Sequence, residues 1–358
     1  MCPTRTDALK VAKGKMDLWT CQHCSHLFNI AFDEKLMDYK GNYENALHFS
    51  PKFQTYATNL IQRLVENYQL KGKHIVEIGC GDGQFLKQIC QLGNNRGVGF
   101  DPSCTPSVDP HQQVVLFNRS FFEVKLEFSI DFICCRHVLE HVSNPITFLT
   151  TLHATLKKQS KSCYLYFEVP NADYMLEEQA YFDLIYEHFT YFTTQSLRYL
   201  FEKTGFIVQK VTTNFGGQFL GIEVAVPSSK NSQNAPKVTF PKSTSRNDFT
   251  NTFHEKIHNC KQQISQLTDA GKNILLWGAG SKGITLLNIL QTEAIAQVID
   301  INPRKHHHYV PGTGQKIISP TTLKTYSPDI IIVMNAIYNE EIQQFLTQNE
   351  ISARIINW

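Results

Sequence analysis

The sequence of 358 residues lacks the features that mark several classes of protein. No apolar run approaches the roughly 20 residues that span a bilayer, and residues 1–20 hold no continuous apolar core typical of a secretory signal. The formal net charge is only +2, so bulk charge favours neither nucleic acid nor a membrane as partner. The ten cysteines are scattered, unlike those of a secreted disulfide scaffold. We expect a cytoplasmic protein with reduced thiols, no nucleic-acid partner and no membrane contact.

The residues that are present have the balance of an ordinary folded protein, with 42% apolar and 18% charged residues. A chain of this length is expected to form about two or three domains. Residues 227–247 are rich in Ser, Asn, Pro and Lys, which is the composition of a linker. We therefore divide the chain into an N-terminal cysteine-containing segment (1–48), a first domain (49–226), this linker and a second domain (248–358).

Strands and helices are predicted to alternate through both domains. In the first, "KHIVEIGCGDG", "RGVGFDPS", "SIDFICC" and "CYLYFEVPN" each contain an apolar strand, with amphipathic helical stretches between them. In the second, "KNILLWGAG", "AQVIDIN" and "DIIIVMN" repeat this order. The alternation predicts an α/β fold in which a parallel sheet is covered by helices on both faces.

The first domain carries a glycine turn after its first strand. "VEIGCGDG" places three glycines at the carboxyl end of that strand, where open α/β sheets bind ligands: Gly79, Gly81 and Gly83. Glu77 and Asp82 make the surroundings acidic, which suits a cationic ligand better than a pyrophosphate. Asp101 ends the next strand, where a carboxylate commonly accepts hydrogen bonds from ribose hydroxyls. The alternative is a glycine turn that holds no ligand.

The second domain carries a different glycine turn, "WGAGSKG". Gly278, Gly280 and Gly283 have the G-x-G-x-x-G spacing of dinucleotide-binding proteins. Asp300 follows about 20 residues later, at the position of a ribose-binding acid. Alone, this pattern would predict an NAD-dependent oxidoreductase, but no hydride-transfer constellation accompanies it. We interpret the turn as a site for a nucleotide-like group or as a purely structural element.

Three motifs in the first domain, "EIGCGDG", "GFDPS" and "FICCRHVLEHV", resemble those of the class I S-adenosylmethionine-dependent methyltransferases. The resemblance implies a Rossmann-like core with S-adenosylmethionine as cofactor. It also implies that the methionine end of the cofactor is framed by four residues: Glu77, Gly79, Gly81 and Gly83. Asp101 would then hold the ribose, Phe122 in "NRSFF" would wall the adenine, and His137 would lie near the methionine and adenosine.

The order of the remaining motifs narrows the resemblance. A cysteine cluster, the methyltransferase motifs, "IYEHFTYF" and then "WGAGSKG" with "IDINPRK" and "PGTGQKI" resemble the C-methyltransferases of nucleotide-linked keto-deoxysugars. The resemblance implies methylation of carbon through an enolate. A histidine can remove the proton near neutral pH, and a tyrosine hydroxyl can support the enolate. We assign His188 as the base, Tyr186 as the donor to the enolate or substrate, and Glu187 as the group that orients the imidazole. Substrate contacts are expected from Tyr191, Gly278, Gly280 and Gly283.

Two departures from that family lie on the expected substrate side. "IYEHFTYF" lacks the inner histidine of the family element, and "NFGGQF" stands where the family has His-Gly-Gly-Ser. An oxygen or nitrogen acceptor on another small molecule therefore stays open. So do an NAD-dependent oxidoreductase, a nucleotide-sugar binding protein without turnover, and a purely structural Glu187–His188 pair.

One Cys-x-x-Cys pair, Cys21 and Cys24, supplies half of the four ligands of a closed structural zinc site. The family resemblance implies two such pairs, so a complete site here would have to recruit Cys2 and a neighbouring histidine. We name zinc as a candidate cofactor, against the alternative of two thiols packed in a small hairpin. The oligomeric state is left open.

Overall fold

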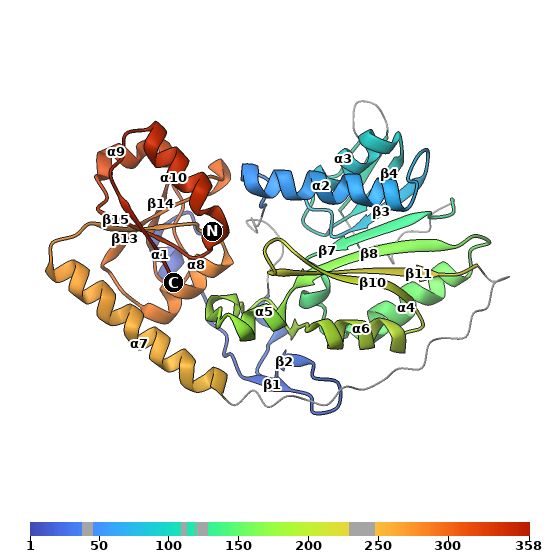
Figure 1. The fold of residues 1–358 in the computed structure, drawn as a ribbon, viewed down its shortest axis with the longest axis horizontal. Coiled ribbons are helices and arrows are strands. Elements are labelled where there is room, and N and C mark those ends of the chain that lie inside the picture. The colour runs from blue at the N-terminus through green and yellow to red at the C-terminus, as the bar shows by residue number, and fades with distance from the viewer. Residues whose placement is uncertain (38–45, 109–112, 119, 121–127, 229–247) are drawn as a thin grey trace.

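The computed structural model describes residues 1–37, 46–108, 113–118, 120, 128–228 and 248–358. Two α/β domains lie side by side, and a small N-terminal hairpin lies against the first of them (Figure 1). Phe122 and all but the first residues of the proposed linker 227–247 lie outside the described residues. No described helix has both the length and the apolar character needed to cross a membrane.

The N-terminal segment is tied to both domains. It contains α1 (Arg5–Leu9), β1 (Leu18–Thr20), β2 (Leu27–Asn29) and the short 3-10 helix η1 (Glu34–Leu36). β1 and β2 form an antiparallel hairpin, and β9 (Thr190–Tyr191) of the first domain pairs with β2 to complete a three-stranded sheet. Near the chain start, the backbone of Cys2 exchanges two hydrogen bonds with Tyr309 of the second domain.

The first domain begins with the helix predicted after Ser50. The Ser50 hydroxyl accepts a hydrogen bond from the Phe53 amide, and Pro51 occupies the first turn. The elements that follow are α2 (Pro51–Asn67), β3 (His74–Ile78), α3 (Gln84–Gly93), β4 (Arg96–Phe100), β5 (Ser107–Val108), β6 (Val114–Phe117), β7 (Phe132–Arg136), η3 (Leu139–His141), α4 (Pro145–Lys157), β8 (Cys163–Pro170), α5 (Ala172–Glu177), η4 (Tyr181–Asp183), α6 (Thr194–Lys203), β10 (Ile207–Asn214) and β11 (Phe219–Val226).

These strands form one eight-stranded sheet in the order β10-β11-β8-β7-β3-β4-β6-β5. The five strands from β8 to β6 are parallel, as predicted. The expectation of a wholly parallel sheet is wrong for two strands: β11 runs antiparallel to both β8 and β10, and β5 runs antiparallel to β6. Only residues 215–218 separate β10 from β11, and a connection that short can join antiparallel neighbours but not parallel ones. The order and directions are those of a Rossmann-like class I methyltransferase sheet.

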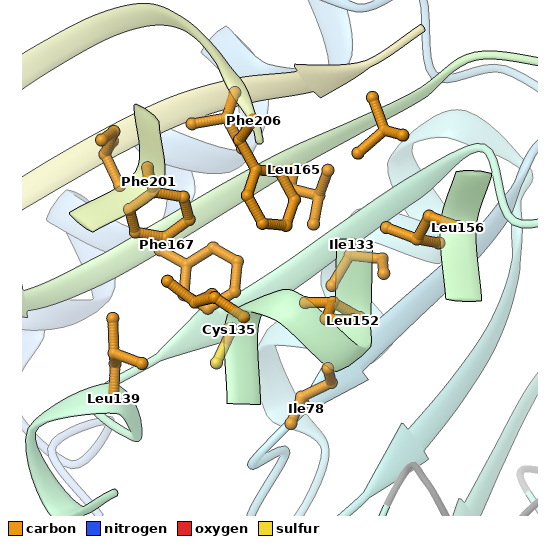
Figure 2. Packing of buried hydrophobic residues seen from close by; sticks show 14 of the residues in the cluster. Ile78, Ile133, Cys135, Leu139, Leu152, Leu156, Leu165, Phe167, Phe201 and Phe206 are labelled. Atoms are coloured by element: carbon orange, nitrogen blue, oxygen red, sulfur yellow. The ribbon is translucent and has the colours of Figure 1, made fainter. Parts of the chain in front are cut away.

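The hydrophobic core of this domain covers both faces of the sheet, as predicted. On one face, buried residues of α2 and α3 pack against β3 and β7. On the other face, α4 and α6 pack against β7 and β8 (Figure 2). Residues labelled there are Ile78, Ile133, Cys135, Leu139, Leu152, Leu156, Leu165, Phe167, Phe201 and Phe206. Burial of apolar surface stabilises a fold by roughly 25 cal/mol per Å². Because helices bury both faces of the sheet, the carboxyl ends of β3 and β7 are held in fixed positions.

The second domain has the predicted strand and helix alternation. It consists of α7 (Asp248–Asp269), β12 (Ile274–Trp277), α8 (Ser281–Leu290), β13 (Ile295–Ile299), η5 (Pro303–Lys305), β14 (Lys316–Ile318), η6 (Pro320–Thr322), α9 (Leu323–Tyr326), β15 (Ile330–Val333), η7 (Ala336–Tyr338), α10 (Asn339–Gln348) and β16 (Arg354–Asn357). The sheet is parallel throughout, in the order β14-β13-β12-β15-β16. Both of its faces carry a buried apolar cluster.

Candidate active site

The first glycine turn is held open by backbone hydrogen bonds to the next strand. The Gly79 amide donates to the Phe100 carbonyl at 2.7 Å, and the Gly81 amide donates to Asp101 Oδ2 at 2.9 Å. All three glycines have positive φ (75°, 51° and 77°), which side chains other than glycine rarely adopt. A Cβ built on Gly81 would meet no heavy atom within 4 Å among the described residues. A ligand can therefore approach the backbone closely at this position.

Asp101 lies beside this turn, at the end of β4. Besides the Gly81 amide, its carboxylate accepts hydrogen bonds from the amide and hydroxyl of Ser103, at 2.7 and 2.6 Å. A carboxylate offers about four acceptor positions, so capacity remains for a ribose hydroxyl. Asp101 is also partly exposed rather than sealed in the core.

Glu77 lies at the base of the turn and is only 3% exposed. Burial raises the pKa of its carboxyl to about 8, although Arg136 acts in the opposite direction. Its Oε2 atom has no hydrogen-bond partner within the described part of the chain. Because buried polar atoms are nearly always paired, this atom and the acidic surroundings fit the positively charged methionine end of S-adenosylmethionine.

A charged network that sequence reasoning missed lies at the ends of β7 and β8. Fully buried Glu168 accepts a hydrogen bond from Arg136 Nε at 3.1 Å and one from the Tyr56 hydroxyl, and His137 Nε2 lies 3.3 Å away. Burial alone would raise the pKa of Glu168, but Arg136 and His137 reverse the effect and hold it well below its usual range. The signal for this network was weak, because Tyr56 is 112 positions from Glu168 in the chain.

His137 lies between two buried carboxylates. Its Nδ1 is 3.6 Å from Glu140 Oε1, and its Nε2 is 3.3 Å from Glu168 Oε1. Burial disfavours the charged imidazolium, yet these two carboxylates outweigh it and raise the pKa of His137 to about 9. Its φ of +54° is unusual for a residue with a side chain, and such conformations are frequent at functional sites.

The predicted base, His188, lies in a second buried cluster. Its ring is 4.9 Å from that of His141 and 5.8 Å from that of Tyr191, centre to centre. Metal-ligating atoms of Glu140, His141 and His188 all lie within 4.8 Å of one another. Burial, and secondarily the proximity of His141, lower the pKa of His188 to about 3, so its imidazole is neutral at physiological pH. Glu140 and His141 were not among the predicted site residues, although both lie in the quoted motif "FICCRHVLEHV".

The other residues of "IYEHFTYF" face different neighbours. The Tyr186 hydroxyl accepts a hydrogen bond from the Asp33 amide at 3.0 Å, and its ring packs against Gly14 and Phe32 of the N-terminal segment. Glu187 reaches the cluster through its backbone, because its carbonyl oxygen is 2.8 Å from His141 Nδ1. The Tyr191 hydroxyl donates to the Ile185 carbonyl at 2.7 Å, which shapes the loop around His188. The catalytic and substrate roles assigned to these side chains stay predictions.

The second glycine turn is closed around its own acid. Asp300 Oδ2 accepts a hydrogen bond from the Ala279 amide at 2.8 Å and lies 3.4 Å from Lys305 Nζ. Both side chains are buried, and Lys305 also donates to the Ala279 carbonyl at 3.0 Å. A Cβ on Gly283 would lie 2.1 Å from the Gly278 carbonyl oxygen, so this glycine permits tight packing of α8 on the turn.

α8 nevertheless reaches the predicted substrate segment. Lys282 Nζ is 2.8 Å from Asp183 Oδ1, where "DLIYEHF" begins, and it donates to Gln218 Oε1 at 3.0 Å. Gln218, the residue after the two glycines of "NFGGQF", also exchanges hydrogen bonds with Asn335 at 2.8 and 2.9 Å. The second domain thus contacts "NFGGQF" directly, the segment that differs from the His-Gly-Gly-Ser element of the sugar C-methyltransferases.

The same domain also touches the cofactor turn. Arg304 Nη2 lies 3.4 Å from Asp82 Oδ2, and His48 lies 3.7 Å from the same atom. In contrast, a surface hollow of about 620 Å³ lies against α10 and β16 and contains none of the predicted site residues.

Cys21 and Cys24 occupy the tip of the β1–β2 hairpin. The Cys21 amide donates to the His26 carbonyl at 2.8 Å, and the Ser25 amide donates to the Cys21 carbonyl at 2.9 Å. Neither cysteine belongs to a group of three candidate ligands in the portion of the chain that the structure describes. Cys2 is held instead against the second domain by its backbone bonds to Tyr309. Zinc at this hairpin remains a prediction.

Comparison with known proteins gives two family matches along the chain. A family model described as "Methyltransferase domain" matches residues 51–211, and one described as "C-methyltransferase C-terminal domain" matches residues 236–355. The "tRNA U34 carboxymethyltransferase" of Campylobacter lari is 26% identical over 158 residues, which cover 37% of this chain and 52% of that protein. The mitochondrial "Ubiquinone biosynthesis O-methyltransferase" of Dictyostelium discoideum is 26% identical over 106 residues, covering 25% and 33%. The chain spans about half or less of these curated relatives.

Solved structures with a similar chain trace include two methyltransferases. A "SAM dependent methyltransferase from Aquifex aeolicus" is 15% identical with a TM-score of 0.33, covering 46% of this chain and 89% of that one. The magnesium protoporphyrin IX methyltransferase of Synechocystis PCC 6803 with bound SAH is 16% identical with a TM-score of 0.36, covering 50% and 84%.

The family matches agree with the strand order and with a glycine turn that fits a cationic, ribose-containing cofactor. Residues 51–211 therefore form a methyltransferase domain with the class I, Rossmann-like fold, and residues 236–355 match a C-methyltransferase C-terminal domain.

Proposed function

We propose that the protein methylates a carbon atom of a nucleotide-linked keto-deoxysugar through an enolate. The observation that carries the proposal is the pair of imidazoles formed by buried His188 and half-buried His141, beside the carboxylate of Glu140 and one short segment away from the cofactor turn. Val138, in that segment, packs directly on Gly79, because a Cβ on the glycine would lie 2.1 Å from Val138 Cγ2. A match to a C-methyltransferase C-terminal domain supports carbon as the acceptor.

Carbon becomes a nucleophile only when a proton is removed next to a carbonyl group, and His188 is our candidate for that base. Burial, with His141, lowers its pKa to about 3, so the imidazole is unprotonated at neutral pH but is a weak base in the free protein. Proton transfer to it therefore depends on a neighbouring charge that stabilises the imidazolium. The imidazolium that forms would be stabilised by Glu140, whose pKa is lowered by His137, His141 and His188 against the effect of burial. General bases typically contribute about 10²–10⁴ in rate.

The other steps depend on alignment. When bound, S-adenosylmethionine supplies an electrophilic methyl group, and Glu77 with the open backbone at Gly81 would hold its methionine end. Asp101 would hold the ribose. In-line methyl transfer demands close alignment of carbon, methyl and sulfur, which the rigid contact between Gly79 and Val138 would help to maintain.

The second domain would hold the nucleotide part of the substrate near the turn of Gly278, Gly280 and Gly283. Lys282 supports this assignment, because its ion pair with Asp183 joins that turn to the segment that leads to His188. We retain Tyr186, Glu187 and Tyr191 as residues that shape or contact the substrate. The net charge of +2 favours a small-molecule acceptor over nucleic acid and is compatible with a cytoplasmic enzyme.

Solvent exchange tests the enolate directly. The protein, loaded with S-adenosylhomocysteine so that no methyl group can move, is incubated in D₂O with a panel of nucleotide-linked keto-deoxysugars. We expect deuterium to enter the carbon next to the carbonyl, detected by NMR. In His188→Asn the exchange rate should fall by about 10²–10⁴, while S-adenosylhomocysteine binding is retained.

His153→Asn provides the matched control, because His153 lies on α4 against Phe206 and is not one of the candidate site residues. Exchange that is unchanged in His188→Asn would remove this histidine as the base. Methyl transfer without any exchange would instead favour an oxygen or nitrogen acceptor.

A further inference from the structure

We propose that Glu140, His141 and His188 form a binding site for a divalent transition-metal ion. Each of the three residues offers a ligand atom, and these atoms all lie within 4.8 Å of one another. Two imidazoles and one carboxylate suit Zn²⁺, Co²⁺ or Mn²⁺ better than Mg²⁺ or Ca²⁺, which prefer oxygen ligands throughout. The inference does not depend on the proposed reaction.

Two atoms of the cluster lack the hydrogen bonds that buried polar atoms normally have. His188 Nδ1 and Glu140 Oε2 have no partner anywhere in the described residues, although the two side chains are only 6% and 1% exposed. For Glu140 the two oxygens differ, because Oε1 is the one next to His137 Nδ1, at 3.6 Å. An ion bound between them would satisfy both orphaned atoms at once.

His141 makes, through one ring nitrogen, the hydrogen bond to a protein oxygen that metal-ligating histidines usually make through the nitrogen that does not bind the metal. Its Nδ1 is 2.8 Å from the Glu187 carbonyl oxygen. A carbonyl oxygen can only accept, so Nδ1 must carry the proton and the lone pair is placed on Nε2. Ligating histidines typically donate their second ring N–H to a carbonyl or carboxylate in this way. The backbone of "YEHF" therefore sets the tautomer that a metal requires.

The charge of the cluster also fits a cation. Glu140 supplies a carboxylate, and the other two ligands are imidazoles, which bind metal ions in their uncharged form. A cation would occupy the lone pair of His188 that the proposed proton abstraction uses. Ion-loaded protein is therefore expected to exchange substrate protons more slowly than chelator-treated protein.

Calorimetric titration with Co²⁺ tests the site. The full chain is used with Cys21→Ser and Cys24→Ser, so that thiolates at the hairpin contribute no binding. We expect Co²⁺ to bind this protein, and its affinity to fall by at least about 100-fold in Glu140→Gln, His141→Asn or His188→Asn. His153→Asn should bind Co²⁺ as well as the parent does.

Folding is checked in each variant by its affinity for S-adenosylhomocysteine, which should not change. The inference is overturned if the parent with Cys21→Ser and Cys24→Ser binds no Co²⁺, or if the three ligand variants bind it undiminished while S-adenosylhomocysteine binding is intact. Deuterium exchange is measured on chelator-treated protein, so the failure of this site and the failure of the proposed reaction can be told apart.

Discussion

The two glycine turns of the molecule share one backbone frame. In each, the first glycine donates its amide to the last residue of the neighbouring strand, Gly79 to Phe100 and Gly278 to Ile299, both at 2.7 Å. In each, an acid that follows that strand accepts an amide of the turn, at 2.9 Å for Asp101 and 2.8 Å for Asp300. The two turns therefore share these hydrogen bonds at the same edge of their sheets, although all three glycines of the first turn have positive φ and only Gly278 of the second turn does.

The side chains around this frame differ. Two residues before the first glycine, the methyltransferase turn has Glu77, whereas the second turn has apolar Leu276 at the equivalent strand position. Asp101 is partly exposed and bonded only to neutral groups, while Asp300 is buried against Lys305. Asp300 occupies the position at which Asp101 could hold a ribose, but its charge is balanced by Lys305. A glycine fingerprint thus describes a backbone conformation, and the neighbouring charges decide whether it serves a ligand.

The largest expected effect of this difference is on stability. Asp300→Asn leaves the buried ammonium of Lys305 without its counter-charge, so the free energy of unfolding should fall by about 3–5 kcal/mol. Denaturant unfolding followed by circular dichroism measures this. S-adenosylhomocysteine affinity of the folded fraction should be unchanged.

The double variant Asp300→Asn with Lys305→Met is the matched control, since it removes both charges and should recover much of the lost stability. If Asp300→Asn proved fully stable, the buried pair would not be what closes the second turn. Binding of NAD by the wild-type protein would contradict the comparison more directly, because it would require Asp300 to be available to a ribose.

The equivalent change in the first turn should act on ligand affinity instead. Asp101→Asn keeps the shape of the side chain but removes its charge and one acceptor oxygen. Hydrogen bonds to charged groups contribute about 1.5–3 kcal/mol, so S-adenosylhomocysteine should bind roughly 10- to 100-fold more weakly by calorimetry. Stability should change little, since the partners of Asp101 in the protein are neutral. Undiminished affinity would show that Asp101 serves only to hold Ser103 and the turn.

The two turns show which features the sequence predicts and which it does not. The strands, the helices and both glycine turns follow from local patterns, such as Ser50 and Pro51 at the start of α2 or the apolar run of β3. The antiparallel β11 was missed because strand direction depends on connection length rather than on apolar pattern. No local pattern in the sequence places Lys305 in the interior, and only tertiary packing brings it to Asp300.

The candidate site shows the same limit. His188 and the cofactor turn could be predicted from motifs. Glu140 and His141 could not be recognised as site residues, because they meet His188 only when a loop some 50 residues later folds onto them. The sequence also does not predict where a side chain points. The Tyr186 hydroxyl, for example, accepts a hydrogen bond from the Asp33 amide in the N-terminal segment. Contacts between segments distant in sequence leave no periodic signal.

A pH dependence should belong to the first turn alone. Below about pH 8 the buried carboxyl of Glu77 is protonated in the free protein, because burial raises its pKa to about 8. S-adenosylhomocysteine has a neutral sulfur but carries an α-ammonium group at its homocysteine end. That positive charge favours the ionised form of Glu77, so binding must release this proton. Affinity for S-adenosylhomocysteine should therefore rise with pH by at most about tenfold per unit and level off above pH 8.

Glu77→Gln tests this origin of the pH dependence. The variant should bind with an affinity that is nearly independent of pH between about 6.5 and 8.5, measured by calorimetry in buffers of different ionisation enthalpy. Leu276→Gln, at the equivalent position of the second turn, is the control and should leave the slope intact. A slope that persists in Glu77→Gln must come from another group, and the acid at the base of the turn would then have no part in binding the cation.

The smallest effect should come from the side chain that links the second turn to the first domain. Lys282→Met removes the ion pair with Asp183 and the hydrogen bond to Gln218 while keeping the length of the side chain. The pair is partly exposed, so its loss should cost about 0.5–1.5 kcal/mol. We expect a KM for the acceptor raised roughly two- to tenfold, with kcat and S-adenosylhomocysteine affinity close to those of the wild type.

Lys272→Met supplies the control, since it removes an exposed ion pair with Asp329 elsewhere in the same domain. If Lys282→Met lowered kcat and left KM unchanged, the link would act on the reacting groups rather than on the placement of the substrate. If neither constant moved, the second turn would be a structural repeat of the first with no share in the site. In the second turn, Asp300 is bound to Lys305 and is not available to a ribose. The Lys282 variant therefore tests whether this turn still contributes to substrate binding by holding the segment that begins at Asp183 in position.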